Sequence, residues 1–179
     1  MKIFLDFDDF FLRTEDALVA DFFQLLTGVT GATQEDVLQT YKKFSGARFV
    51  KGLPYSLEQH IDFLAESSSF DTKRAKEKAR AFFVDLKKYV FDGSEKFLQG
   101  LPKRDTYLLT YGEQTFQELK IEGSGLKKFF HKVLVTQGDK SEEIERVAKR
   151  EGFSLDETVV FGDNRCGHFV GAKERGIIT

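Results

Sequence analysis

Residues 2–9 read Lys-Ile-Phe-Leu-Asp-Phe-Asp-Asp, a short apolar run that ends abruptly in acidic residues. A continuous apolar run bounded by polar residues is typical of a buried strand in a parallel sheet. Asp6, Asp8 and Asp9 would then lie at the carboxyl end of that strand, which is where open α/β sheets bind their ligands. The stretch therefore predicts both the first strand of a sheet and the place of a polar site.

Further apolar segments, separated by helical patterns, follow this strand toward the end of the chain. The strand candidates are residues 107–110, 133–136, 158–161 and 176–179, and the helix candidates are residues 114–120, 141–151 and 168–175. Strands that alternate with helices imply right-handed crossovers and an open parallel sheet. We therefore expect an α/β fold with a Rossmann-like parallel sheet.

Residues 13–90 interrupt this alternation, because they offer helical patterns and no convincing strand. The expected helices are residues 17–26, a helix that Thr33 would cap, residues 60–65 after the capping-box pattern at Ser56, and a long basic helix at residues 71–89. This pattern predicts a helical domain at residues 13–90, inserted into a core made of residues 1–12 and 91–179.

The composition argues against several classes of partner. The formal net charge of −2 provides no basic excess for nucleic acid or for an anionic membrane surface. No apolar run is long enough to span a bilayer, and acids interrupt the apolar first twelve residues, unlike a signal peptide. The single cysteine, Cys166, excludes an intramolecular disulfide. A cytoplasmic protein without nucleic-acid or membrane partners is the expectation.

The residues that follow each predicted strand suit phosphoryl transfer. They are Asp6, Asp8 and Asp9 after the first strand, Thr110, Tyr111 and Gly112 after the second, Lys140 after the third, and Gly162, Asp163 and Asn164 after the fourth. A phosphate dianion repels a carboxylate nucleophile, so a cation must lie between them. Carboxylate oxygens can hold Mg²⁺, and a lysine can stabilise the charge on the phosphoryl oxygens. A second acid can protonate the leaving alcohol and then activate water.

These residues resemble the four motifs of the haloacid dehalogenase-like superfamily. Asp6-Phe-Asp-Asp resembles the first motif, Leu108-Leu-Thr110 the second, Lys140 the third, and Val159-Val-Phe-Gly-Asp163 the fourth. Their order fits over essentially the whole chain. Gly93 matches a glycine usual before the second motif, and the helical insertion resembles the superfamily's C1-type cap.

The resemblance implies a role for each matching residue. Asp6 would be the nucleophile and a metal ligand, and Asp8 the general acid and base, with its backbone carbonyl on Mg²⁺. Thr110, Tyr111 and Lys140 would bind the phosphoryl group, and Asp163 would complete the metal site with possible help from Asn164. Arg13, Arg48 and Lys51 are candidates for cap residues that face the substrate.

Two positions differ from the superfamily's pattern. Phe10 stands where Thr or Val is usual, and Gly162 precedes Asp163 where a second acid is often found. The expected function is a Mg²⁺-dependent phosphatase that acts on a small phosphorylated metabolite through an aspartyl-phosphate. The two differences motivate an alternative, a catalytically weak relative that binds a phosphorylated ligand or a protein partner.

Other readings of the same residues remain open to different degrees. A phosphomutase fits the motifs. A dehalogenase fits less well, since it needs neither Mg²⁺ nor an acid like Asp8, and a phospho-accepting receiver domain lacks a helical insertion after its first strand. Nucleotides, sugar phosphates and phosphoglycolate all remain possible substrates.

Overall fold

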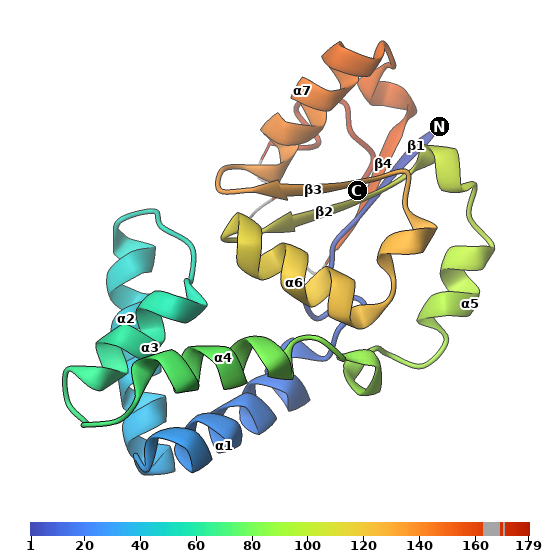
Figure 1. The fold of residues 1–179 in the computed structure, drawn as a ribbon. Helices are drawn as coiled ribbons and strands as arrows, with labels where there is room; N and C mark the ends of the chain where they lie inside the picture. Colours follow the sequence, from blue (N-terminus) through green and yellow to red (C-terminus); the bar gives the residue numbers. More distant parts are fainter. Residues whose placement is uncertain (163–168, 170) are drawn as a thin grey trace.

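The computed structural model describes residues 1–162, 169 and 171–179. Within these residues, four strands form one parallel sheet in the order β3-β2-β1-β4 (Figure 1). The strands are β1 (Lys2–Leu5), β2 (Thr106–Tyr111), β3 (Lys132–Thr136) and β4 (Thr158–Phe161). The apolar run before Asp6 is thus an inner strand, and Phe4 and Leu5 are completely buried. The α/β fold expected from the sequence is confirmed.

Helices cover both faces of the sheet, because the side chains of each strand alternate between two hydrophobic clusters. Leu108 packs in the cluster of α6 (Gln114–Ser124), whereas Tyr107 and Leu109 pack in that of α7 (Lys140–Glu151). Figure 1 shows these two helices on opposite sides of the strands. The remaining core elements are α5 (Ser94–Gln99), η3 (Lys103–Asp105), η4 (Lys127–Phe129) and η5 (Leu155–Glu157).

The last predicted helix and strand take a different form. Residues 171–176 form turns rather than the end of a helix, and Gly171 and Gly176 there have left-handed φ values of 78° and 81°. The helix predicted at residues 168–175 is therefore wrong over residues 171–175, because the left-handed Gly171 cannot continue an α-helix. The predicted fifth strand is reduced to one parallel bridge beside β4, between Ile178 and Val159.

A helical block packs beyond the carboxyl ends of the strands. It comprises the π-helix η1 (Thr14–Leu18), α1 (Val19–Thr30), α2 (Gln34–Val50), α3 (Leu57–Ala65) and α4 (Thr72–Phe82), seen in blue to green in Figure 1. Its two connections to the sheet run side by side, since Leu12 and Val90 form an antiparallel bridge. None of the described helices is both long and apolar enough to cross a membrane. The division into two domains stays a prediction.

Two of the local signals in this block were misleading. The capping box at Thr33 is present, with Asp36 as its second member. Ser56 begins α3 but makes no capping hydrogen bond. The helix predicted at residues 71–89 ends at Phe82 and is followed by the short η2 (Lys87–Tyr89). Between them, the Leu86 N–H donates to the Gly123 carbonyl of α6 at 2.8 Å, so a tertiary contact ends the helical pattern.

Gly123 is the contact at which this turn packs on α6. A Cβ at this position would lie 2.0 Å from the Phe83 carbonyl oxygen and 3.3 Å from Leu86 Cγ. We expect Gly123→Ala to lower the free energy of unfolding by about 2 kcal/mol, because backbone must move to admit the methyl group. Urea denaturation measures the change. Gly28→Ala in α1, where a Cβ meets nothing within 4 Å, is the control and should stabilise slightly.

His60 makes the stability of the helical block depend on pH. It is fully buried, its Nδ1 lies 2.9 Å from the Tyr55 hydroxyl, and burial lowers its pKa from 6.5 to about 4. As the pH falls from 6.5 to about 4, the unfolded chain binds a proton at His60 before the folded chain does. We therefore expect the free energy of unfolding to decrease by about 2–3 kcal/mol between pH 7 and pH 4.5 from this group alone.

The variant His60→Gln tests this pH dependence in urea denaturation at both pH values. Its stability should fall less on acidification than that of the unmodified protein, by the amount assigned to His60. His131→Gln, at an exposed position, should retain the full pH dependence. Equal losses in the His60 variant and the unmodified protein would contradict the prediction.

Candidate active site

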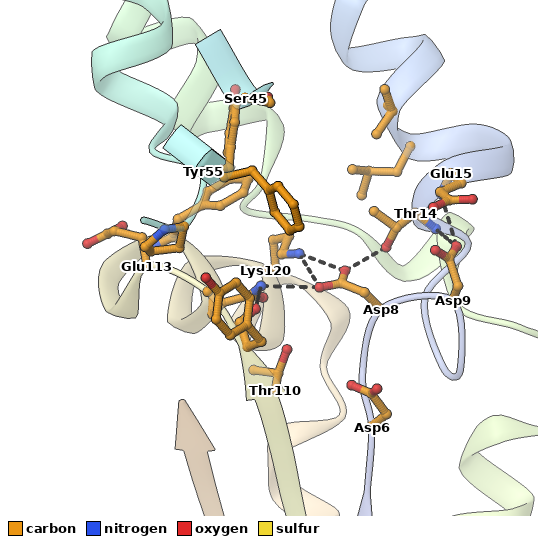
Figure 2. Close-up of a pocket in the computed structure, with 18 of the residues that line it drawn as sticks. Asp6, Asp8, Asp9, Thr14, Glu15, Ser45, Tyr55, Thr110, Glu113 and Lys120 are labelled. Carbon is orange, nitrogen blue, oxygen red and sulfur yellow. Dashed lines mark hydrogen bonds and ion pairs between the residues drawn. The ribbon is translucent and has the colours of Figure 1, made fainter. Parts of the chain in front are cut away.

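A cavity of about 670 Å³ lies between the carboxyl ends of β1 and β2 and the helical block. Its sheet side carries Asp6, Asp8, Thr110 and Lys140, which the sequence singled out separately and the fold brings together. Its other side is formed by residues of α1, α2 and the loop after α2. Figure 2 shows Asp6, Asp8 and Thr110 converging from the strand ends.

Asp6 is held rigidly at the end of β1. Its N–H donates to the Phe161 carbonyl at 2.9 Å, which continues the pairing of β1 with β4. The carboxylate is 5% exposed, and its Oδ1 accepts from the Lys140 ammonium at 2.6 Å and from the Phe7 N–H at 2.8 Å. Burial raises the pKa of Asp6, and the ammonium of Lys140 offsets only part of that increase. The result is a buried, oriented carboxylate with a lysine beside it.

Lys140 lines the cavity from the first position of α7. Asp139 is the N-cap of α7 and accepts from the Ser141 N–H at 2.6 Å. Lys140 is consequently the first residue of the helix, and it is only 2% exposed. Its ammonium lies 5.0 Å from the centre of the Phe169 ring and also binds Asp6.

Asp8 is fixed by three side chains. Lys120 Nζ donates to Oδ1 at 2.6 Å and to Oδ2 at 2.7 Å, Thr14 donates its hydroxyl to Oδ1 at 2.6 Å, and Gln117 donates its amide to Oδ2 at 3.2 Å (Figure 2). Burial by itself raises the pKa of Asp8, but the Lys120 ammonium and these hydrogen bonds outweigh it and lower the pKa. These contacts therefore favour the ionised form of Asp8.

The sequence did not single out Lys120, Gln117 or Thr14. Gln117 and Lys120 are three residues apart on α6, so they share one face of the helix, and both are buried there. Two long polar residues at this spacing on an otherwise apolar helix face were the signal in the sequence that could have identified Gln117 and Lys120 as site residues. Thr14, at the start of η1, is the only one of the three that belongs to the helical block.

The remaining sheet-side residues have distinct surroundings. Thr110 is buried at the end of β2 and lines the cavity. Tyr111 also lines it, and its carbonyl accepts from the Gln117 amide at 2.8 Å. The Gly112 N–H donates to the Thr136 carbonyl at 3.0 Å, so it already has an acceptor. Asp9, with a left-handed φ of 53°, accepts from the Thr14 and Glu15 N–H groups and thereby begins η1.

A comparison with family models matches residues 3–165 to the haloacid dehalogenase-like hydrolases. This match covers most of the chain and includes all four strands of the sheet almost completely. The chain belongs to this hydrolase family. No curated protein matches the sequence.

Solved structures of the family share the fold at low sequence identity. YfnB of Bacillus subtilis, described as a HAD-hydrolase bound to magnesium, is 22% identical over 98% of this chain and 83% of that chain, with a TM-score of 0.66. The L-2-haloacid dehalogenase from Xanthobacter autotrophicus is 15% identical over 98% and 74%, with a TM-score of 0.64. A protein described as a beta-phosphoglucomutase from Thermotoga maritima is 15% identical over 99% and 82%, with a TM-score of 0.61. Proteins described as acting in different ways thus share this fold.

The three cap cations suggested by the family resemblance lie outside the lining of the cavity. Arg13 donates to the Lys88 carbonyl at 2.8 Å. Arg48 donates to the Pro54 carbonyl and to the Gln59 side chain, and its guanidinium lies 5.5 Å from the Phe44 ring. Lys51 is exposed at the end of α2. Local acceptors therefore direct the two arginines away from the site. Asp163 and Asn164 fall outside the described residues.

Neither departure from the family pattern places a side chain in the cavity. Phe10 packs edge-on against Phe11, with ring centres 4.8 Å apart, and is not among the residues that line the cavity. A Cβ at Gly162 would lie 2.8 Å from Phe169 Cε2, 3.0 Å from Asp6 Cβ and 3.2 Å from Asp6 Oδ2. Asp6 and the Phe169 ring thus pack closely around Gly162, and a larger residue at this position would collide with both.

The described residues fit a magnesium ion that retains part of its water. Within the described part of the chain, no group of three or more His, Cys, Asp or Glu side chains is arranged so that it could hold a metal ion by itself. Mg²⁺ is, however, commonly held by one or two carboxylates with several waters. Asp6 Oδ2, which accepts no hydrogen bond from the described residues, has the required hard-oxygen chemistry.

Proposed function

We propose that this hydrolase is a Mg²⁺-dependent phosphatase that acts on a small phosphate monoester through an aspartyl-phosphate on Asp6. The observation that carries the proposal is the pair of carboxylates at the end of β1. Asp6 is buried beside Lys140, and Asp8, two residues later, is held by Lys120, Thr14 and Gln117. One carboxylate is thus positioned for attack and the other for proton transfer.

The proposed reaction has two steps. In the first, a carboxylate oxygen of Asp6 attacks phosphorus while the bond from phosphorus to the alcohol oxygen breaks. That oxygen takes a proton from Asp8, which must first bind one from solvent because its contacts favour the ionised form. In the second, water transfers a proton to the Asp8 carboxylate as its oxygen attacks phosphorus, which releases phosphate and restores Asp6. The ammonium of Lys140 and the hydroxyl of Thr110 bind the phosphoryl oxygens in both steps.

Asp6, the backbone carbonyl of Asp8 and Asp163 are the proposed ligands of Mg²⁺. When bound, the ion neutralises charge on the phosphoryl oxygens and reduces their repulsion of the Asp6 carboxylate. Lys140 offers a second positive charge on the opposite oxygen of Asp6. Within the described residues, this ligand set is supported by Asp6 Oδ2, an oxygen that Lys140 does not bind.

We assign the helical block the role of a C1-type cap. Thr14, which leads into the block, donates to Asp8, so the proposed cap and the proposed acid are directly linked. Residues of α1 and α2 cover the cavity above the strand ends and would exclude water from the transferring group. The three side chains that hold Asp8 also favour phosphoryl transfer over dehalogenation, since dehalogenation needs no acid at this position.

Phosphate release from a panel of monoesters, with Mg²⁺ and with EDTA, tests the proposal. We expect release with Mg²⁺ and a decrease of at least about a hundredfold in EDTA, because the loss of several kcal/mol of charge stabilisation slows the reaction by that order. Adding Mg²⁺ back should restore the rate. Release that is insensitive to EDTA, or no release from any ester by the folded protein, would refute the function.

A further inference from the structure

Six aromatic side chains that line the cavity form a closed circuit of ring contacts, which we call the aromatic collar. The ring centres are 6.4 Å apart for Phe22 and Phe23, 5.1 Å for Phe23 and Tyr41, 5.6 Å for Tyr41 and Tyr55, 5.4 Å for Tyr55 and Phe116, 5.0 Å for Phe116 and Phe83, and 5.1 Å for Phe83 and Phe22. All six residues line the cavity. They come from α1, α2, the loops after α2 and α4, and α6, so several elements build one apolar wall.

The collar lies next to the carboxylate that would protonate the leaving alcohol. Phe116 is on the same helix as Lys120, whose ammonium lies 5.2 Å from the Phe116 ring and binds Asp8. In Figure 2, Lys120 and Asp8 lie between Tyr55 and Asp6. A phosphoryl group at Asp6 would therefore direct its alcohol past Asp8 and into the collar.

The collar presents ring surfaces rather than hydroxyl groups at Tyr55. The Tyr55 hydroxyl lies 2.9 Å from Nδ1 of the buried His60, behind the wall. The apolar surface also continues outward, because Phe49 and Leu53 line the cavity while remaining 78% and 42% exposed. Apolar side chains that remain in contact with water at the rim of an apolar pocket favour an apolar ligand.

The charged residues of the cavity act against a second anionic group on the substrate. Among the described residues, Asp9, Glu15, Glu113 and Asp139 add four carboxylates to the lining beyond Asp6 and Asp8. The lysines in this described part of the lining, Lys120 and Lys140, are both bound to carboxylates. A substrate with one phosphate and an uncharged remainder avoids repulsion by these carboxylates.

We propose that the substrate is the phosphate monoester of an uncharged alcohol that carries an aromatic ring, and that the collar binds this ring. This inference rests on the proposed function, because it places the phosphoryl group at Asp6. It excludes sugar phosphates, whose hydroxyl groups would lose their hydrogen bonds to water against the rings, and substrates with a second phosphate or carboxylate.

Turnover of three esters of primary alcohols tests this substrate class. They are 2-phenylethyl phosphate, glucose 6-phosphate and phosphoglycolate, compared under identical Mg²⁺ concentrations. We expect kcat/KM for 2-phenylethyl phosphate to exceed the other two values by at least about tenfold, as expected for burying an aromatic ring. An equal or higher kcat/KM for glucose 6-phosphate or phosphoglycolate would overturn the proposal.

Binding to the Asp6→Asn variant separates this proposal from the proposed function. Isothermal titration with 2-phenylethyl phosphate should give binding that Tyr41→Ala, added to the same variant, weakens about fivefold or more. Phe97→Ala, an aromatic position on α5 outside the cavity lining, is the matched control and should leave Kd unchanged. Circular dichroism and thermal unfolding verify that each variant is folded.

The combined outcomes are distinguishable. Binding that depends on Tyr41, without turnover of any ester, would refute the phosphatase while retaining the collar as a site for aromatic phosphates. Turnover of other esters, without binding of 2-phenylethyl phosphate, would retain the phosphatase and overturn the substrate class. Binding that Tyr41→Ala and Phe97→Ala affect equally would also overturn it.

Discussion

Replacing Asp6 with Asn is expected to lower kcat/KM for phosphate release by about four orders of magnitude or more. The amide has no negative charge and its nitrogen does not attack phosphorus, so the aspartyl-phosphate cannot form. Removal of a nucleophile in other hydrolases has effects of this size, because the neighbouring groups act only through it. The assay is phosphate release with Mg²⁺, on the best ester of the panel.

The same change should leave the protein folded but somewhat less stable. Lys140, at 2% exposure, would lose its charged partner on Asp6 while keeping the amide oxygen as an acceptor. We expect a decrease of about 1–3 kcal/mol in the free energy of unfolding, measured by urea denaturation. Asp21→Asn, at an acid of α1 that binds Lys88 outside the cavity, is the matched control and should retain activity. Activity of Asp6→Asn within tenfold of the unmodified protein would refute the mechanism.

The parts of the fold that depend on local patterns could be predicted from the sequence. Each strand was recognisable as an apolar run, and the polar residue after it marked the edge of the sheet. Asp6, Thr110 and Lys140 therefore meet in the cavity as expected. Their common location follows from parallel topology alone, since parallel strands end at the same edge of a sheet.

The parts that depend on distant contacts could not be predicted. Lys120 lies 112 residues from Asp8 in sequence, and only the packing of α6 beside the end of β1 joins them. The end of α4 at Phe82 similarly depends on the bond from Leu86 to Gly123. Arg48 has the charge of a substrate-binding residue, yet the nearby Pro54 carbonyl and Phe44 ring determine where it points. Charge alone does not reveal which acceptor a long side chain finds.

Lys120→Met is the second change for which we expect a large effect. Methionine keeps much of the length and apolar character of the lysine side chain. It removes the ammonium, which lies over the rings of Phe7 and Phe116 and donates to both oxygens of Asp8. Asp8 would then be held by Thr14 and Gln117 alone and would lose its alignment with the leaving oxygen. We expect kcat to fall about a hundredfold, the usual contribution of a positioned acid or base.

The ratio of the two kinetic constants distinguishes positioning of Asp8 from direct binding of substrate. Lys120 donates to Asp8 rather than lying at Asp6, so its loss should change KM by less than about threefold while kcat falls. Lys120→Arg retains a cation at the same place and should recover part of kcat, whereas a purely steric role would favour methionine over the larger arginine. If KM rose and kcat did not change, Lys120 would instead contact the substrate. If Lys120→Met retained full kcat, the ion pair with Asp8 would have no part in the reaction.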